Sequence, residues 1–318
     1  MRILTVQSRN GKSPRMGETI HRVNGIELCA EVRGPSDGTP LLLVMGLGAQ
    51  MISWEDDFTD RLVDRGYRVA RFDNRDAGRS TWFDDARVDV MATLKALAAG
   101  EDVEVPYTLS DMAADAAALL DELGMSPAHV VGASMGGMIV QTMAIEQPQA
   151  VRSVVSIMST TGDRDVGQPT PDATKLLFGA PPSTLDEALE RARQSEATWG
   201  SPAHRDPEAA EARARREWER ARNAAGVGRQ LVAINASGSR TEALRQVTVP
   251  FTVIHGDADT LVTPSGGART AEAVTHAVHV EIEGMGHNLP RPLWPQIMDA
   301  IDATVSRTRD DDPTRHTN

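Results

Sequence analysis

The 318-residue chain contains 45 acidic and 33 basic residues, which gives a formal net charge of −12 at pH 7. This charge repels phosphate backbones and anionic lipid surfaces, so nucleic acid is excluded as an expected partner. With 40% hydrophobic and 25% charged residues, the composition is that of a globular chain rather than a fibrous or disordered one. The single cysteine, Cys29, excludes an intrachain disulfide and a cysteine-based metal site, and it favours a reducing compartment.

The N-terminal segment and the longest apolar runs indicate the cellular compartment that the sequence predicts. Residues 1–16 lack the apolar run of about 7–15 residues that a secretory signal needs, and no segment approaches the ~18 apolar residues of a membrane span. We therefore expect a cytoplasmic protein with no membrane span. A single folded domain is expected over residues 17–307, with flexible tails at 1–16 and 308–318.

Strand signals begin with a hairpin and continue as short apolar runs. Residues 19–32 are predicted to form two strands joined at Asn24-Gly25, a dipeptide that strongly favours a tight turn. The later runs are bounded by turn residues, which is typical of strands buried on both faces of a sheet. They lie at residues 41–45, 67–72, 129–131, 154–158, 251–254 and 278–282.

Helical patterns lie between several of these strands. Residues 108–111 form a capping-box pattern at the start of a helix that Gly124 ends. Further helices are expected over residues 135–147 and, from apolar residues at helical spacing, over 294–305. Strands that alternate with helices predict βαβ units, and therefore an α/β fold with a mainly parallel central sheet and flanking helices.

The alternation breaks over residues 161–239, where no strand-like run occurs. Three helices are expected there, one capped by Ser183, one opened by Asp206-Pro207 and one that includes residues 230–235. The segment has too few apolar residues to form a core of its own. We therefore expect a helical lid that packs on the sheet.

Residues 132–136, Gly-Ala-Ser-Met-Gly, match the G-x-S-x-G pattern, in which a sharp turn between a strand and a helix exposes a serine hydroxyl. Glycines flank the serine because its strained backbone brings the neighbouring strand and helix close together. The strand expected before the motif and the helix expected after it supply the required context. Ser134 is therefore the candidate nucleophile.

A serine nucleophile needs a base to take its proton, and the base needs a carboxylate to orient it. Asp259 lies after the strand predicted at 251–254, and His287 lies in a Gly-Met-Gly-His loop after the strand predicted at 278–282. The carboxyl ends of parallel strands meet at one edge of a sheet, so these residues are expected to converge on the serine. Asp257 remains an alternative for the acid.

Other histidines are less suitable for a catalytic role. His129 and His255 lie inside or at the end of apolar runs, which favours His287 as the base. His276 and His279 lie three residues apart, but no third ligand accompanies them. We therefore expect neither a metal site nor a cofactor.

The negative charge that develops on an attacked carbonyl oxygen requires hydrogen-bond donors. The backbone N–H of Met135, at the start of a helix, is one expected donor, and the N–H of Leu47 in the turn at residues 45–48 is the other. Apolar side chains near these positions are expected to line a substrate pocket, with plain core packing as the alternative for several of them. Besides Leu47 and Met135 they are Met51, Met158, Leu177, Phe178 and Leu261.

Several of these segments together resemble the α/β-hydrolase superfamily over about residues 17–305. They are residues 44–48 (Val-Met-Gly-Leu-Gly), 73–80 (Asp-Asn-Arg-Asp-Ala-Gly-Arg-Ser), 132–136, 255–259 (His-Gly-Asp-Ala-Asp) and 284–287 (Gly-Met-Gly-His). The first two are similar to a subgroup that contains aclacinomycin methylesterases and actinobacterial lipases and carboxylesterases. Met45 stands where most relatives have a histidine, at a position whose side chain is structural.

The resemblance implies an α/β-hydrolase fold with a helical lid insertion. It also implies that Ser134 is the nucleophile, Asp259 the acid and His287 the base, with Leu47 and Met135 as oxyanion donors. Relatives that open epoxides or remove halides have aspartate at the nucleophile position, so the serine argues against both activities.

For residues 73–80 the resemblance implies a scaffold role. The alternative is that Arg75 or Arg79 binds a carboxylate of the substrate.

We expect hydrolysis of a small-molecule carboxylic ester through an acyl-enzyme on Ser134, as in carboxylesterases and lipases. Alternatives on the same triad are a thioesterase, a C–C bond hydrolase, a polyketide methylesterase and a cofactor-free haloperoxidase or perhydrolase. A ligand receptor without catalysis is the alternative from a different class. No oligomeric state is predicted.

Overall fold

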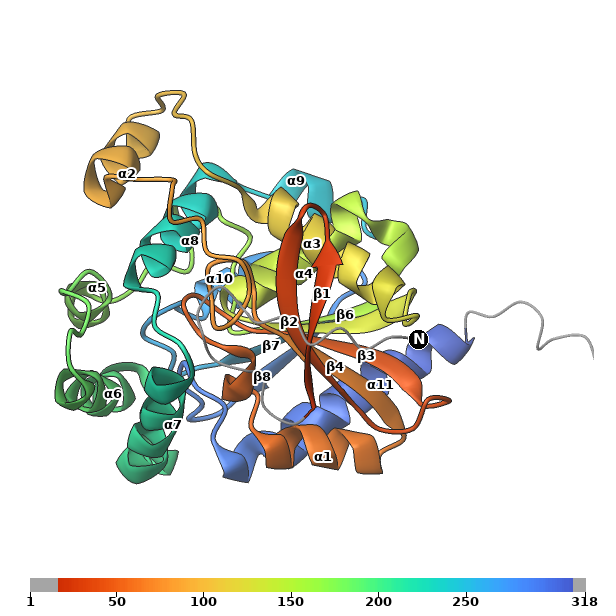
Figure 1. The fold of residues 1–318 in the computed structure, drawn as a ribbon. Coiled ribbons are helices and arrows are strands. Elements are labelled where there is room, and N and C mark those ends of the chain that lie inside the picture. The colour runs from red at the N-terminus through yellow and green to blue at the C-terminus, as the bar shows by residue number, and fades with distance from the viewer. Residues whose placement is uncertain (1–16, 311–318) are drawn as a thin grey trace, which may run out of the picture.

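The computed structural model describes residues 17–310 as a central sheet with helices on both sides (Figure 1). Its eight strands follow the order β1-β2-β4-β3-β5-β6-β7-β8. β1 pairs with β2, and β2 with β4, in antiparallel fashion, whereas the remaining neighbours are parallel. The strands are β1 (Glu18–Val23), β2 (Ile26–Arg33), β3 (Thr39–Val44), β4 (Tyr67–Phe72), β5 (Ala128–Ala133), β6 (Val151–Ile157), β7 (Phe251–Gly256) and β8 (Val278–Ile282). The predicted mainly parallel sheet is confirmed.

The strand predictions agree with the structure to within about three residues at the strand ends, and they differ in the burial of the last strand. The hairpin forms at Asn24 and Gly25, which both have positive φ, as a tight turn requires. β3 and β5 are buried over most of their length, in agreement with the apolar runs. β8, however, was predicted to be buried on both faces and is largely exposed, with Val278 44% exposed. The reason is its place at the edge of the sheet, where only β7 adjoins it.

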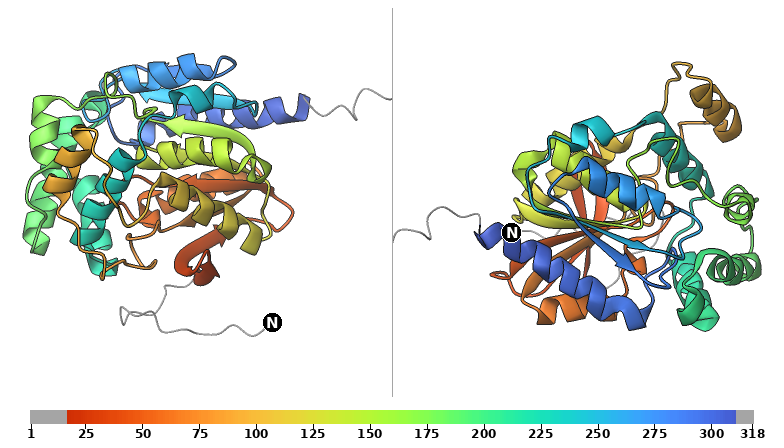
Figure 2. Two further views of the ribbon diagram at one scale, coloured as in Figure 1. Left: turned by 90° about the horizontal axis from the view of Figure 1, so that it is seen from above. Right: turned by 180° about the vertical axis from the view of Figure 1, so that it is seen from behind.

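Helices cover the two faces of the sheet, and each face has its own apolar core. α3 (Leu109–Glu122), α4 (Met135–Glu146) and α10 (Ser265–Ala273) pack on one face. α1 (Asp56–Asp64) and α11 (Trp294–Asp310) pack on the other, as the rear view in Figure 2 shows for α11. The capping box predicted at residues 108–111 is present at the start of α3.

The segment between β6 and β7 contains no strand and lies to one side of the sheet (Figure 1). Its helices are α5 (Pro171–Leu177), α6 (Leu185–Trp199), α7 (Pro207–Arg220) and α8 (Ala224–Ala236), followed by the short α9 (Thr241–Leu244). Four helices thus occupy residues 161–239, where three were predicted. Asp206 caps α7 as expected, but the cap of α6 is Thr184 rather than Ser183, because the Thr184 hydroxyl accepts the Glu187 N–H.

Five of the described helices, α1, α2, α5, α9 and α10, were not predicted. α2 (Val90–Ala98) buries none of its residues, so it shows no single apolar face, and α5 is only seven residues long. α11 continues to Asp310, beyond the domain end predicted at 307. The rest of that predicted tail, and the whole of the tail predicted at 1–16, lie outside the described residues. None of the helices described is long and apolar enough to span a membrane.

Candidate active site

Ser134 lies on a tight turn between β5 and α4. Its φ of 57° is in the left-handed region, which is strained for a residue with a side chain. A Cβ on Gly132 would lie 2.1 Å from the Gly136 carbonyl oxygen, and one on Gly136 would lie 2.1 Å from that of Val44. The Ser134 N–H donates to the Ile157 carbonyl at 2.9 Å, which ties the turn to β6. Close backbone packing therefore explains both flanking glycines.

The predicted base and acid lie beside this serine. His287 Nε2 is 3.0 Å from Ser134 Oγ, and His287 Nδ1 is 2.7 Å from Asp259 Oδ2. Burial raises the pKa of the Asp259 carboxyl, but the charge of His287 and hydrogen bonds from His255 and His287 outweigh burial and lower this pKa to about 2. Asp259 is therefore ionised at neutral pH. A proton on Nδ1 satisfies its carboxylate and leaves Nε2 free to accept the serine proton.

The alternative acid has a different partner, and the neighbouring histidine contacts Asp259 at 3.4 Å and also a backbone carbonyl. Asp257 is exposed, and its Oδ1 accepts the Gly284 N–H at 2.6 Å. His255 is fully buried, and its Nε2 lies 2.8 Å from the Val262 carbonyl oxygen. Of the two aspartates that the sequence left open, the structure brings Asp259 to His287.

Residues at the end of α6 hold the histidine loop, and sequence reasoning missed them. The His287 N–H donates to the Trp199 carbonyl at 2.5 Å. Ser201 is fully buried; its hydroxyl accepts the Gly286 N–H at 2.9 Å and donates to Asn288 Oδ1 at 2.6 Å. No local pattern marks these residues, because the contacts join segments 85 positions apart in the chain.

The two residues predicted to supply the oxyanion donors lie next to Ser134. Leu47 and Met135 both line the cavity at Ser134. Met135 is the first residue of α4, so its N–H has no acceptor within the helix. Gly46 packs so tightly that a Cβ on it would lie 3.0 Å from Ser134 Cβ, which brings the turn at 45–48 against the serine. Their role as oxyanion donors stays a prediction.

A cavity of about 940 Å³ opens at Ser134 and His287. Five of the predicted pocket residues line it: Leu47, Met135, Met158, Leu177 and Leu261. Met51 does not, because it is buried in the interior (1% exposed), where its N–H donates to Asp73 Oδ1 at 2.8 Å. Phe178, just after α5, is 45% exposed and also lies outside the cavity lining.

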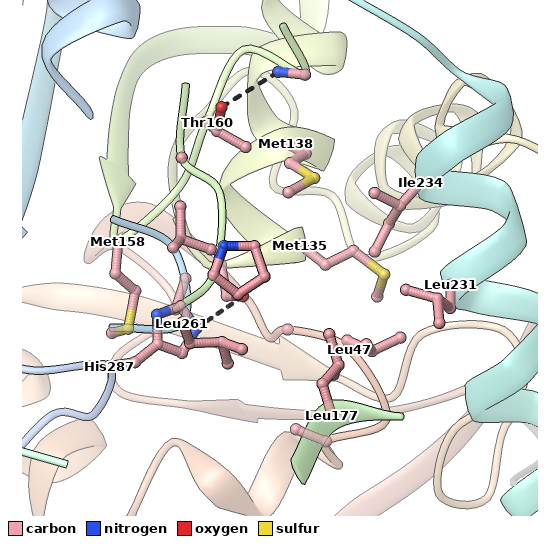
Figure 3. Close-up of a pocket in the computed structure, with 18 of the residues that line it drawn as sticks. Leu47, Met135, Met138, Met158, Thr160, Leu177, Leu231, Ile234, Leu261 and His287 are labelled. Atoms are coloured by element: carbon pink, nitrogen blue, oxygen red, sulfur yellow. Dashed lines mark hydrogen bonds between the residues drawn. The ribbon is translucent and has the colours of Figure 1, made fainter. Parts of the chain in front are cut away.

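Helices that the sequence did not connect with the site complete the cavity wall. Leu231 and Ile234 of α8 lie opposite Met135 and Met138 of α4 (Figure 3). Residues of α2 also contribute, although that helix precedes the insertion by more than sixty positions. The cavity is therefore walled mainly by apolar side chains from both the sheet domain and the insertion, with polar side chains such as Arg213 and Asn235 also in its lining.

Other residues that the sequence singled out lie away from this cavity. Arg75 pairs with Asp115 at 2.7 Å, and Arg79 pairs with Glu18, so neither faces the serine as a carboxylate-binding group. His276 Nε2 lies 2.9 Å from a backbone carbonyl oxygen. Within residues 17–310, no group of three or more histidine, cysteine, aspartate or glutamate side chains is arranged to hold a metal ion.

Comparison with known proteins agrees with this architecture. Residues 39–290 match the sequence profile of the alpha/beta hydrolase fold family. The chain is similar to rhodomycin D methylesterase DnrP of Streptomyces peucetius, with 31% identity over 301 residues that cover 87% of this chain and 94% of that protein.

Solved structures of the same fold are also similar. The enol-lactonase from Burkholderia xenovorans LB400 is 23% identical with a TM-score of 0.65, and the match covers 92% of this chain and all of that one. The esterase RhEst1 from Rhodococcus sp. ECU1013 is 20% identical with a TM-score of 0.67, covering 92% of this chain and 99% of that one. At these identities the likeness concerns the fold. With its matched profile, its sheet order and its serine turn after β5, the chain belongs to the alpha/beta hydrolase fold family.

Proposed function

We propose that this protein is a serine hydrolase that cleaves carboxylic esters through an acyl-enzyme on Ser134. The observation that carries the proposal is the unbroken series of hydrogen bonds from Ser134 Oγ through His287 to Asp259, with Ser134 and His287 in the lining of a cavity. An activated serine of this kind attacks acyl carbons.

The reaction proceeds in two halves. In the first, Ser134 Oγ attacks the ester carbonyl carbon while His287 Nε2 takes the serine proton. The N–H groups of Leu47 and Met135 stabilise the charge on the carbonyl oxygen. His287 then gives its proton to the leaving alkoxide, which departs as the alcohol. In the second half water attacks the acyl-enzyme in the same way and releases the carboxylic acid.

The substrate class follows from the cavity and from a relative. A volume of about 940 Å³ is near the upper end for small-molecule sites, and apolar walls suit a large acyl group. The similarity to a protein named rhodomycin D methylesterase supports a methyl ester as the bond that is cleaved. We therefore infer that the substrate is a methyl ester of a bulky, mainly apolar carboxylic acid, within the general carboxylesterase class.

Two expectations accompany this proposal. Residues 161–239 act as the lid, because α5 supplies Leu177 and α6 supplies Trp199 to the cavity lining. The cytoplasmic location stays a prediction, with which the single cysteine is consistent.

The first test of the proposal is covalent labelling with a fluorophosphonate, measured by intact mass. The wild-type protein should gain one adduct, Ser134→Ala should gain none, and Ser110→Ala, an exposed control on α3, should label normally. No adduct on the wild type would refute an activated serine.

Substrate panels then test the ester and its size. Methyl esters of phenylacetic, 1-naphthylacetic and 1-pyreneacetic acid differ only in the acyl group, so kcat/KM should rise along this series. A falling series would refute the bulky acyl group. Labelling without hydrolysis of these esters or of p-nitrophenyl acetate would refute ester cleavage while leaving the activated serine in place.

A further inference from the structure

The turn at residues 45–48, which carries the proposed oxyanion donor Leu47, is held at both ends by buried side chains. Asn74 Nδ2 donates to the Met45 carbonyl at 2.9 Å. At the other end, the Gly48 N–H donates to Oε1 of Gln230 at 2.7 Å. Gln230 belongs to α8 and is fully buried, so a helix of the insertion contacts the turn directly.

A second contact fixes the orientation of the Gln230 amide. Its Nε2 donates to the Arg75 carbonyl at 2.8 Å. If the amide were reversed, its oxygen would face a carbonyl and its NH₂ would face the Gly48 N–H. The two contacts therefore hold Oε1 toward the turn.

α8 is itself fastened to the loop after β4. Arg229, next to Gln230, makes a two-pronged ion pair with Asp76, with its Nε 2.8 Å from Oδ2 and a terminal nitrogen 2.7 Å from Oδ1. A Cβ on Gly226 would lie only 2.4 Å from the Asp76 carbonyl oxygen. α8 therefore lies as close to this loop as its backbone permits, and Gln230 has little freedom to move away.

The turn needs such support because its own sequence is flexible. Gly46 and Gly48 flank Leu47, and Gly48 has a φ of 69°. Glycine has a wide choice of backbone angles, and within the turn the Ala49 N–H donates to the Gly46 carbonyl at 3.3 Å; the external contacts restrict the peptide units on either side of Leu47 further. Val227 of α8 fills the remaining space, since a Cβ on Gly48 would lie 2.9 Å from its Cγ2.

We propose that Gln230, together with Asn74, is a positioning residue that keeps the Leu47 N–H directed at the carbonyl oxygen of the substrate. This inference rests on the proposed function, because it concerns the oxyanion hole of the ester hydrolysis. It means that α8 supports the oxyanion turn as well as lining the cavity, much as Trp199 at the end of α6 supports the His287 loop.

The main variant is Gln230→Met, which keeps the volume and removes both hydrogen bonds. Loss of a whole oxyanion donor costs about 10²–10³ in kcat, so a misdirected Leu47 N–H should lower kcat by roughly 10- to 100-fold. KM should change by less than about threefold, because the donor acts mainly on the transition state. Binding of a boronic acid, which forms a tetrahedral adduct with serine, should weaken in parallel, whereas binding of the product acid should not.

The matched control is Gln141→Met on α4. Gln141 is also fully buried, and its amide also makes two hydrogen bonds, to the side chains of Ser156 at 3.1 Å and Arg240 at 3.1 Å. Neither of these hydrogen bonds is to the turn at residues 45–48. Its variant should keep kcat within about threefold of the wild type. Gln230→Glu retains an acceptor for the Gly48 N–H and, in its protonated form, a donor for the Arg75 carbonyl, so it should recover part of the loss seen in Gln230→Met.

The outcomes separate this inference from the proposed function. A wild-type protein that neither labels nor hydrolyses esters would refute the function itself. A wild type that does both, with Gln230→Met losing no more kcat than Gln141→Met, would overturn the positioning role alone. Should Gln230→Met fail to fold, Asn74→Leu tests the other end of the turn, and an unchanged kcat and boronic acid affinity there would also overturn the proposal.

Discussion

Replacement of Asp259 by asparagine tests the proposed triad most sharply, because the surrounding hydrogen bonds dictate how the new side chain must lie. Oδ1 of Asp259 accepts the backbone N–H groups of Leu261 at 2.9 Å and Val262 at 3.0 Å. An oxygen must stay at this position, so the amide nitrogen of Asp259→Asn takes the place of Oδ2 and faces His287 Nδ1, now 2.7 Å from Oδ2. Nδ1 must then accept a hydrogen bond, and the imidazole proton moves to Nε2.

The size of the effect follows from this change of tautomer. With a proton on Nε2, His287 points a donor at Ser134 Oγ, 3.0 Å away, and cannot take the serine proton. The corresponding loss in serine hydrolases is on the order of 10⁴ in kcat. At about 1.4 kcal/mol per tenfold change, this is about 5 to 6 kcal/mol of transition-state stabilisation. KM should change little, because the geometry of the cavity is retained.

The assay is the steady-state hydrolysis of the naphthylacetic methyl ester, with the rate of fluorophosphonate labelling as a second readout. Asp257→Asn is the matched control, since Asp257 is exposed and bonds the Gly284 N–H rather than His287. It should keep kcat within about threefold. The reasoning would be refuted by Asp259→Asn retaining more than a tenth of wild-type kcat, or by Asp257→Asn losing as much as Asp259→Asn.

Three further predictions concern stability. The pKa of Asp259 is about 2 in the folded protein against 3.8 for the free side chain, so its contribution to the free energy of unfolding is complete above about pH 3.8 and is lost as the pH falls through 2. Urea titrations should therefore show that the stability difference between the wild type and Asp259→Asn shrinks across this window. A constant difference would contradict the ion pair. Gly136→Ala places a Cβ 2.1 Å from the Val44 carbonyl oxygen and should cost about 1–3 kcal/mol in thermal melting, unless the backbone relaxes freely. Arg220→Met leaves the buried Asp73 carboxylate without its guanidinium partner, now 2.7 Å away, and should cost about 3–5 kcal/mol in urea unfolding, whereas an unchanged midpoint would show that this pair is dispensable.

Local sequence patterns predicted much of the fold, because each pattern depends only on the backbone geometry or burial of its own segment. The Asn24-Gly25 turn, the capping box of α3 and the apolar runs of the inner strands needed no knowledge of distant contacts. α2, one of the helices that were not predicted, shows no such constraint, because it buries none of its residues and is placed by contacts with α8.

The sequence by itself indicated the fold through strands that alternate with helices, and the serine turn through the G-x-S-x-G segment, because its glycines permit the close backbone packing that this turn requires. It favoured Asp259 as the acid but kept Asp257 as the alternative, since both lie in the loop after β7 and local spacing does not reveal which carboxylate faces His287. Only the tertiary structure decided that choice, placed Met51 in the interior rather than the cavity, and brought Gln230 to the Gly48 amide. Gln230 and Gly48 are separated by 182 positions, and such contacts depend on how whole helices pack against the sheet, which no pattern within one segment encodes.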